Sequence, residues 1–204
     1  MKKSMTISYV IGNKLYMNIT NKCPCACTFC IRNNADGAYD SDPLWLEHEP
    51  TIDEIKTNID THNLSSYDEI VFCGYGEPTS KLTELLETAE YMKLHKNCPP
   101  IRLNTNGLSN LINNISTASM LCNIFDIISI SLNAGTKDEY MSVTRPKFLD
   151  AFESLQTFTL DCVKSGKSRI IMTVVDVISE CEIESARKLC EKLGADFRVR
   201  SYDS

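Results

Sequence analysis

Short apolar runs alternate with helical patterns along this chain. Two of the runs, 6–11 and 14–20, flank a Gly-Asn turn and predict a hairpin at the start of the chain. The run at 14–20 is also the first of six that alternate with helices, and the other five are 69–74, 102–106, 127–133, 169–176 and 196–202. Alternation of this kind is typical of a parallel α/β sheet. The pattern predicts a partial (β/α)6-type TIM barrel of six strands and five helices, with a short N-terminal β-hairpin strand.

The helical segments begin and end at recognisable signals. Thr51 with Glu54 and Ser179 with Glu182 have the spacing of capping boxes, and Gly194 is placed to end the last helix. With 204 residues, of which 43% are hydrophobic, the chain is long enough for one good core. The whole chain is therefore predicted to be a single domain.

Polar residues occupy alternate positions in several predicted strands. In a barrel, such alternation points one set of side chains into the lumen and the other set toward the helices. The predicted lumen set is Tyr16, Asn18, Arg102, Asn104, Asn106, Ser129, Ser131, Asn133, Asp196, Arg198, Arg200 and Tyr202. The predicted helix-facing set is Met17, Ile19, Leu103, Ile130, Leu132, Phe197 and Val199. Closed barrels fill the lumen with branched apolar side chains, so a polar lumen favours an open barrel that binds polar ligands.

The composition narrows the setting and the partners. A formal net charge of −6 argues against binding to nucleic-acid backbone or to an anionic membrane, since both reward basic surfaces. The apolar stretch after Lys2 and Lys3 is too short for a signal peptide, and no run is long enough to span a membrane. Ten cysteines without an export signal indicate a reducing compartment, so a cytoplasmic protein is expected.

Four of these cysteines crowd into the eight residues at 23–30. Cys23, Cys27 and Cys30 have the spacing CxxxCxxC, and thiolates at such spacing hold iron-sulfur clusters. Three protein ligands leave one metal position free, which indicates chemistry at the metal. Cys25 lies inside the same loop, where a bystander role is favoured over that of a spare ligand. The other cysteines are scattered, so one cluster is expected.

A second motif, Gly74-Tyr75-Gly76-Glu77-Pro78, follows the apolar run at 70–72. Together with the cysteine spacing, it resembles the radical S-adenosylmethionine (SAM) enzymes. The family's motif at this point is Gly-Gly-Glu-Pro, which grips the amino group of SAM. Here Tyr75 replaces the first glycine of the pair, while Gly74, Gly76 and Glu77 still match.

The resemblance implies a 4Fe-4S cluster held by Cys23, Cys27 and Cys30, with the methionine end of SAM on the fourth iron. An electron from the cluster then splits SAM into methionine and a 5'-deoxyadenosyl radical, which takes hydrogen from a substrate. The most similar group is that of the radical SAM proteins associated with TatD-family hydrolases, to which we assign no reaction. This similarity runs through 18–21, 30–34, 73–79 and 197–200.

Further cofactor contacts follow from the resemblance. The family places groups that touch the SAM ribose at the end of the fourth strand, here Ser131 and Asn133. Backbone near Val174 is expected beside the adenine, and Asn106 is a further candidate for cofactor binding. A reducing partner such as ferredoxin or flavodoxin is also implied, and a cluster of this kind is oxygen-sensitive.

Substrate contacts are predicted around the lumen and in the loop at 31–50. Arg198 and Arg200 are candidate anchors for an anionic group, with ion pairing to glutamates at the barrel rim as the equal alternative. Arg32 and Asn104 complete the candidate substrate set. The loop is long enough for a lid, in which Trp45 either shields the radical from water or simply packs the loop down.

Three functions stay open at this point. The first is a radical SAM enzyme acting on a small polar or anionic molecule, with a nucleotide-related substrate among the options. The second is an activating enzyme that installs a glycyl radical on a partner protein, which requires a site open to a peptide loop. The third is a non-catalytic zinc or iron-sulfur module in which Cys25 completes four ligands, and it leaves the motif at 74–79 unexplained.

Overall fold

The computed structural model describes residues 2–38 and 41–202. Their seven strands form one sheet in the order β1-β2-β3-β4-β5-β6-β7, with β1 antiparallel to β2 and all later neighbours parallel. The strands are β1 (Ser8–Ile11), β2 (Lys14–Met17), β3 (Glu69–Phe72), β4 (Ile101–Thr105), β5 (Ile127–Ser131), β6 (Arg169–Val175) and β7 (Asp196–Arg200). The α/β class, the N-terminal hairpin and the six parallel strands are confirmed.

The connections between parallel strands hold more helices than the five predicted. The α-helices are α1 (Ile52–Asp60), α2 (Leu82–Lys93), α3 (Ser109–Asn113), α4 (Ala118–Ile124), α5 (Lys137–Thr144), α6 (Ala151–Ser165) and α7 (Glu180–Leu193). Short 3-10 helices are η1 (Ile31–Asn33), η2 (Leu64–Ser66) and η3 (Pro78–Lys81). Two connections contain a pair of helices because Asn114 and Arg145 adopt left-handed backbone conformations that end α3 and α5.

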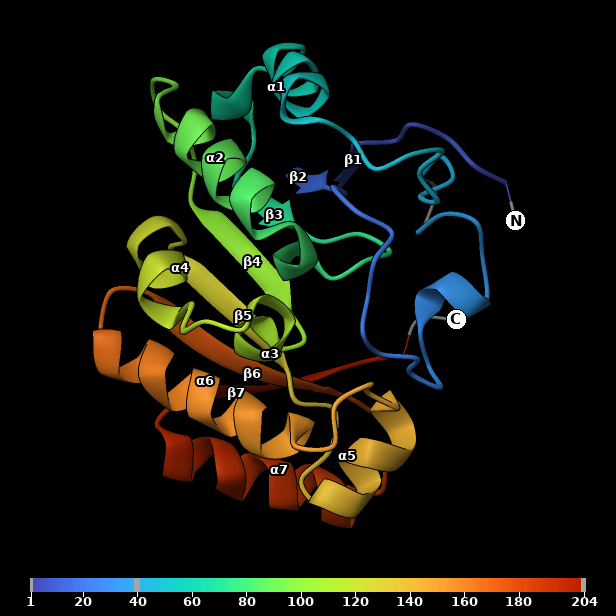
Figure 1. Cartoon of the computed structure of the whole chain (residues 1–204), viewed down its shortest axis with the longest axis vertical. Helices are drawn as coiled ribbons and strands as arrows, with labels where there is room; N and C mark the ends of the chain where they lie inside the picture. Colours follow the sequence, from blue (N-terminus) through green and yellow to red (C-terminus); the bar gives the residue numbers. More distant parts are fainter. Residues whose placement is uncertain (1, 39–40, 203–204) are drawn as a thin grey trace.

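The helices and the long loops lie on different sides of the sheet. In Figure 1, α2, α4, α6 and α7 flank one face of the strands, and the blue segment between β2 and α1 arcs over the other side. The main core fills the space between the sheet and the helices, and it includes Leu103, Ile130 and Met172 from strands with Leu155 and Phe158 from α6. The opposite face has polar residues and loops, and it also has a second apolar cluster of Tyr9, Ala38, Leu44 and Tyr75.

The predicted alternation within the strands is largely confirmed. Met17, Ile19, Leu103, Ile130 and Leu132 are fully or almost fully buried. Val199 was expected against the helices, but it is 40% exposed because β7 is the edge of the sheet. Its neighbour Phe197 is partly buried and lies under the Arg187 guanidinium of α7, 4.7 Å from the ring centroid.

All six parallel strands end earlier than predicted: β2 ends at Met17, β3 at Phe72, β6 at Val175 and β7 at Arg200. The other two ends differ from the prediction for reasons that concern the site. The predicted strand 102–106 ends at Thr105, because the Asn106 backbone N–H donates to the Glu77 carboxylate. The predicted strand 127–133 ends at Ser131, and Asn133 has a left-handed backbone with φ 64°. These residues therefore lie in the loops that follow the carboxyl ends of the strands.

One of the two predicted capping boxes is complete. Thr51 accepts from the Glu54 N–H, and the Glu54 carboxylate accepts from the Thr51 N–H at 2.8 Å. Ser179 accepts from the Glu182 N–H, but the second half of that box is wrong. The Glu182 carboxylate instead accepts from the N–H groups of Gly135 and Thr136, 46 or 47 residues away along the chain. Gly194 ends α7 with φ 77°, as predicted.

Candidate functional site

The cysteine loop follows β2 and is tied to the last residues of α5 and to the segment after it. Ala26 N donates to Thr144 O at 3.1 Å, Thr28 N donates to Val143 O at 2.9 Å, and Lys147 N donates to Pro24 O at 3.0 Å. Cys25 also forms an isolated β-bridge with Pro146. These backbone contacts fix the loop without using any cysteine side chain, so the thiols are left for other roles.

The loop is also joined to the glycine motif that follows β3. Glu77 N donates to Lys22 O at 2.7 Å. The Arg32 guanidinium donates to Cys25 O at 2.7 Å and to Tyr75 O at 3.3 Å. Two motifs that are about fifty residues apart therefore form one unit, with Arg32 as the side chain between them.

Both motif glycines are required by this close packing. A Cβ on Gly76 would lie 2.3 Å from Thr20 O, and a Cβ on Gly74 would lie 2.0 Å from Asn18 Oδ1. Neither glycine has a left-handed backbone, so the demand is for space and not for conformation. The atoms that come close to these two glycines therefore belong, in part, to the chain itself.

The four thiols of the loop differ in their surroundings. Cys25 is buried, while Cys23, Cys27 and Cys30 are half-buried. Hydrogen bonds with the Cys25 thiol lower the pKa of Cys23 and of Cys27, and the same two contacts raise the pKa of Cys25. Burial raises the pKa of Cys30. Cys25 is thus the most buried of the four thiols and lies beside two of the predicted ligands.

No single-ion site is formed by this arrangement. Within residues 2–38 and 41–202, no three histidine, cysteine, aspartate or glutamate side chains surround a common ion position. The zinc module with Cys25 as fourth ligand therefore gains no support from the geometry. A 4Fe-4S cluster places its cysteines on different iron atoms, so it does not need ligands that converge on one point.

Glu77 is a buried carboxyl group with an unusual set of partners. Its Oε1 accepts from Thr79 N at 3.2 Å, from Thr79 Oγ1 at 2.7 Å and from Thr105 Oγ1 at 2.7 Å. Its Oε2 accepts only from Asn106 N, at 2.7 Å. Burial raises the pKa of Glu77 although these hydrogen bonds oppose the shift.

No cation is paired with Glu77 among the residues that the structure describes. The hydrogen bonds fix the carboxylate in place, and Oε2 keeps capacity for another donor. A buried carboxylate without a positive partner is costly, and a bound ammonium group relieves that cost. The environment of Glu77 thus suits the amino group of SAM.

Tyr75 and Trp45 together pin the first part of the loop at 31–50. The Tyr75 side chain is buried, and its hydroxyl donates to Ala35 O at 2.7 Å and also lies 3.0 Å from Gly37 O. Burial raises the pKa of Tyr75 to about 12. The Trp45 ring packs edge-on against it with centroids 5.3 Å apart, so the packing role is the one this contact supports.

The second half of the same loop is fixed by polar residues around the cysteine loop. Asn18 Nδ2 donates to Leu44 O at 2.8 Å, and Asn21 Nδ2 donates to Leu46 O at 2.8 Å. Glu49 accepts from Thr20 Oγ1 at 2.7 Å. Residues 39–40 of the predicted lid at 31–50 lie outside the described residues.

The other predicted cofactor residues lie at the carboxyl ends of β5 and β6. Ser131 is half-buried at the end of β5, and Asn133 follows it as a buried residue. The Val174 side chain is completely buried in the core, which leaves only its backbone for a ligand. The Asn106 side chain lies nearer the thiols, with Nδ2 3.7 Å from the Cys25 sulfur.

The predicted substrate residues are spread over the polar face of the sheet. Ser131, Thr173 and Arg198 form one row across β5, β6 and β7. Arg198 and Arg200 are exposed, and no glutamate in the described residues forms an ion pair with either, so rim pairing is not observed. Asn104 Oδ1 is buried without a hydrogen-bond partner. Arg32, by contrast, is occupied by backbone carbonyls.

Several residues at the site escaped the sequence-based prediction. Tyr140 of α5 is buried, and burial is the main cause of its raised pKa, with smaller contributions from Cys25, Cys27 and Glu77. Nothing in a short amphipathic helix marks this tyrosine as a neighbour of the thiols. Thr105 is an apolar-face residue by its strand position, and only its contact with Glu77 reveals it as part of the site.

The sheet and its cysteine loop define an α/β enzyme of the partial-barrel type. Residues 17–190 match the model of the Radical SAM superfamily, and the chain belongs to that family. The family uses a 4Fe-4S cluster and SAM, and the thiols at 23–30 and the buried Glu77 fit those two cofactors. No curated protein matches the chain significantly in sequence.

Solved structures with a similar fold include two of SuiB and one of a radical SAM methyltransferase. SuiB from Streptococcus suis has a TM-score of 0.66 and 14% identity, and the match covers 94% of this chain and 40% of SuiB. A radical SAM methyltransferase from Sphaerobacter thermophilus has a TM-score of 0.64 and 16% identity, with coverage of 95% and 57%. The S-adenosylmethionine-bound structure of SuiB gives a TM-score of 0.60 at 16% identity, covering 93% of this chain and 38% of SuiB. The chain thus spans less than two thirds of these neighbours.

No helix of the described residues has both the length and the hydropathy that a membrane span requires.

Proposed function

We propose that this radical SAM enzyme cleaves SAM reductively and uses the product radical on a small polar or anionic substrate. When bound, the cluster supplies one electron to SAM, and SAM yields methionine and a 5'-deoxyadenosyl radical that takes a hydrogen atom from the substrate. Cys23, Cys27 and Cys30 are the proposed cluster ligands. Their support is the backbone anchoring of the loop, which leaves these thiols unused by the fold.

Glu77 is the proposed partner of the SAM amino group. The support for this role is that a fixed, buried carboxylate lies beside the thiols with no cation of the described chain paired to it. Gly74 and Gly76 let the segment that carries Glu77 lie against the cysteine loop. They therefore bring the two cofactor sites together, besides any direct contact with SAM.

The remaining cofactor contacts are proposed at the ends of β4, β5 and β6. Ser131 and Asn133 are assigned to the ribose hydroxyls, and the left-handed backbone of Asn133 supports a constrained role there. Backbone at Val174 is assigned to the adenine. Asn106 lies between the Glu77 carboxylate and the Cys25 sulfur, and is assigned to the cofactor pocket.

Arg198 and Arg200 are proposed to bind an anionic group of the substrate. Two exposed guanidinium groups on the same face of β7, with which no described residue forms an ion pair, support this assignment. The unpartnered Oδ1 of Asn104 supports a polar group deeper in the lumen. Arg32 is assigned a lesser role toward substrate, since backbone carbonyls already accept from its guanidinium.

The loop at 31–50 is proposed as the lid. The Asn34 side chain donates to the Tyr202 hydroxyl, which links this segment to the residues just after β7. In Figure 1, η1 lies beside the C-terminal end of the chain, on the side of the sheet away from α6. Closure at this point would cover the space between the two edge strands, β1 and β7.

The single observation that carries the proposal is the union of the cysteine loop with the Gly74–Glu77 segment. It is tested by reconstituting the protein with iron and sulfide without oxygen, reducing it with dithionite, adding SAM and measuring 5'-deoxyadenosine. Wild type should form 5'-deoxyadenosine, and the Cys23→Ala, Cys27→Ala, Cys30→Ala triple variant should not. A Cys98→Ala, Cys181→Ala variant, altered outside the loop, is the control and should behave as wild type. A cluster-loaded wild type that neither binds nor cleaves SAM contradicts the proposal.

Finer assignments belong to the same proposal. We place the chain with the TatD-associated radical SAM proteins on the strength of 18–21, 30–34, 73–79 and 197–200. A ferredoxin or flavodoxin is proposed as reductant, in a cytoplasmic and oxygen-poor setting. Glycyl-radical activation of a partner protein is the alternative, and it requires a site open to a peptide loop. The Asn34–Tyr202 contact, which joins η1 to the segment after β7, argues against such an opening.

A further inference from the structure

Arg32 is the charged side chain that lies between the two cofactor motifs. It belongs to η1 and follows Cys30 by two residues, and Figure 1 shows η1 on the side of the sheet away from α6. Its guanidinium donates to Cys25 O at 2.7 Å and to Tyr75 O at 3.3 Å. Two backbone carbonyls therefore hold the guanidinium at a fixed place between the cysteine loop and the Gly74–Glu77 segment.

The Arg32 guanidinium forms no ion pair within the described residues. Its side-chain partners are carbonyl groups, which carry no net charge, and an arginine is effectively always protonated. Two acids lie in the adjoining segments: the Asp36 charge acts on the Tyr75 hydroxyl, and the Glu77 charge acts on Cys23. Glu77 is the proposed partner of the SAM amino group. Arg32 thus brings one full positive charge to the cysteine loop.

The charge of Arg32 acts on all three proposed cluster ligands. Hydrogen bonds with Cys25 are the main cause of the lowered pKa of Cys23 and of Cys27. The positive charge of Arg32 adds to both of these shifts. Burial raises the pKa of Cys30, and the backbone N–H and the charge of Arg32 both oppose that shift. An effect of the same sign at three sulfur atoms puts the whole ligand set within the field of the guanidinium.

We infer that the Arg32 guanidinium, fixed between Cys25 O and Tyr75 O, raises the reduction potential of the cluster proposed at 23–30. The inference rests on the proposed function, because it needs a cluster held by these cysteines. On reduction the cluster accepts one electron from the donor and gains one negative charge, and no bond is made or broken. A fixed positive charge beside the ligands stabilises the reduced state more than the oxidised state. Arg32 therefore makes the cluster easier to reduce.

The test uses the protein reconstituted with iron and sulfide without oxygen, before SAM is added. Titration with dithionite in the presence of redox mediators gives the reduction potential, with the reduced cluster followed by electron paramagnetic resonance. In Arg32→Gln the equilibrium constant for reduction should fall by about tenfold, which for one electron is a shift of about 59 mV to more negative potential. Arg32→Lys keeps the charge and should stay within about threefold of wild type.

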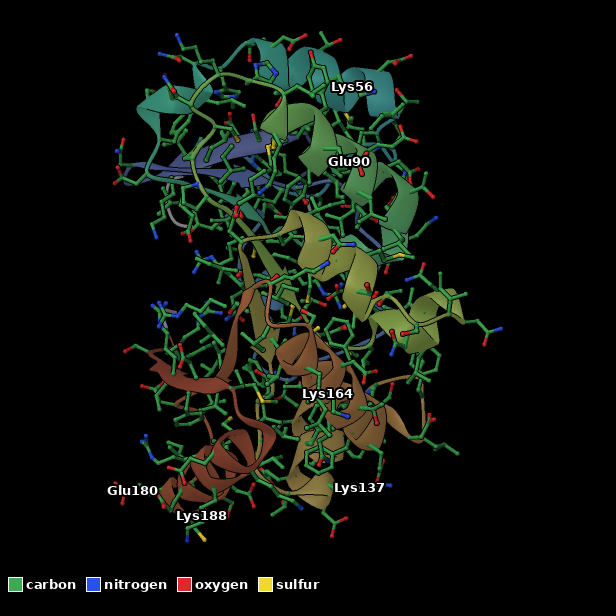
Figure 2. All side chains as sticks on the ribbon, turned by 90° about the vertical axis from the view of Figure 1, so that its left-hand side faces the viewer. Lys56, Glu90, Lys137, Lys164, Glu180 and Lys188 are labelled. Atoms are coloured by element: carbon green, nitrogen blue, oxygen red, sulfur yellow. The ribbon has the colours of Figure 1, made fainter. Side chains whose placement is uncertain are left out.

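A distant lysine provides the matched control. Lys164→Gln removes the same charge from α6 in the helical layer, where Figure 2 shows this lysine, and should leave the potential at the wild-type value. An equal shift in Lys164→Gln and Arg32→Gln would assign the effect to net charge and overturn the inference. Equal potentials in wild type and Arg32→Gln would overturn it as well.

A purely structural role of Arg32 gives a different pattern. If the guanidinium only ties the two motifs together, Arg32→Lys and Arg32→Gln should lower the iron content alike and leave the potential of the loaded protein unchanged. That pattern contradicts the inference. If Arg32→Gln takes up no cluster, Arg32→Met replaces it. Loss of the cluster in both neutral variants, with a full cluster in Arg32→Lys, would assign the charge to holding the ligands and would also overturn the inference.

Wild type separates this inference from the proposed function. A wild type that takes up no 4Fe-4S cluster contradicts the proposed function and the inference together. A loaded wild type that forms 5'-deoxyadenosine, with a potential that Arg32→Gln does not change, contradicts the inference alone.

Discussion

Replacing Gly76 with alanine tests whether the glycine motif is needed by the chain's own packing. The new Cβ would lie 2.3 Å from Thr20 O and 2.8 Å from Lys22 O, and both are backbone atoms. Ordinary contacts begin at 3.4 Å, so the segment at 20–22 must move by about an ångström. That segment is held by Glu49, which accepts from Thr20 Oγ1 and from Asn21 N. The movement would also strain the 2.7 Å hydrogen bond from Glu77 N to Lys22 O.

The expected loss follows from these contacts. Overpacking of a fixed site costs about 1–3 kcal/mol, and weakening one hydrogen bond costs about 1 kcal/mol. Alanine restricts the unfolded chain and so offsets about 0.4–1 kcal/mol of this. Gly76→Ala should therefore lower the free energy of unfolding by about 1–3 kcal/mol. Urea denaturation of the metal-free, reduced protein measures this difference without any contribution from SAM or cluster.

The sign of the change in the free energy of unfolding tests whether the chain packs closely against Gly76. An unhindered glycine without a left-handed backbone is stabilised by alanine, so a neutral or stabilising Gly76→Ala would refute the packing described above. Gly166→Ala is the control, since nothing lies within 4 Å of its Cβ and its φ of 64° alone costs about 1 kcal/mol. After reconstitution, the iron content should fall in Gly76→Ala and stay at the wild-type level in Gly166→Ala. Equal iron content in the two variants would show that the cysteine loop does not need Gly76 to hold a cluster.

Further predictions concern four single side chains. Glu77→Gln should weaken SAM binding to the cluster-loaded protein by about ten- to a hundredfold, since a charged hydrogen bond is lost, and equilibrium dialysis measures it. Burial raises the pKa of Glu77 in the folded protein above its value in the unfolded chain. The contribution of Glu77 to the free energy of unfolding should therefore fall as the pH rises from about 4.3 through the folded pKa. Urea titrations of Glu77→Gln should lack that decline. Thr51→Ala should cost about 1 kcal/mol in urea unfolding through loss of the helix cap, with the exposed Thr57→Ala as control. Hydrogen bonding to Thr51 lowers the pKa of Glu54 to about 2. The stability that ionised Glu54 contributes is therefore present above about pH 4.5 and is lost as the pH falls toward about 2. Glu54→Gln should remove that part of the acid sensitivity. Tyr75→Phe should lower the free energy of unfolding by about 1 kcal/mol and speed proteolysis at 31–38, because the phenolic hydroxyl no longer donates to Ala35 O. Tyr202→Phe should leave the free energy of unfolding within about 0.5 kcal/mol of wild type. Equal cleavage in wild type and Tyr75→Phe would contradict the anchoring role.

The sheet could be predicted from the sequence because its signals are local. The period-two alternation at 127–131 or 102–105 is set by which face of the sheet each side chain meets, and a strand of five residues shows it completely. The ends of those strands depend instead on distant partners. Asn106 leaves the ladder for the Glu77 carboxylate, 29 residues earlier in the chain. Glu182 likewise leaves its own cap for Gly135, which no local pattern indicates.

The candidate site was predictable to the same extent. Three cysteines and the Gly74–Glu77 segment are found by spacing, because their chemistry requires them close together in the chain. Tyr140 and Asn18 act through tertiary contacts, and their residue types are common in helices and strands. Val199 failed for a related reason, since alternation gives the direction of a side chain but not whether a helix covers it.

Tyr75 shows how the chain accommodates its departure from the family motif. Where the family has a glycine next to a glycine, this chain has a tyrosine whose backbone N–H donates to Asn18 Oδ1 at 3.3 Å. The space beside Gly74 is filled by the same Asn18 side chain, so the backbone keeps its course without the second glycine. The phenol then reaches out of the motif to Ala35 O, beyond the cysteine loop. A single substitution thus couples the segment proposed to grip SAM to the segment proposed to close over substrate, and loss of the phenolic hydroxyl should loosen the second without displacing the first.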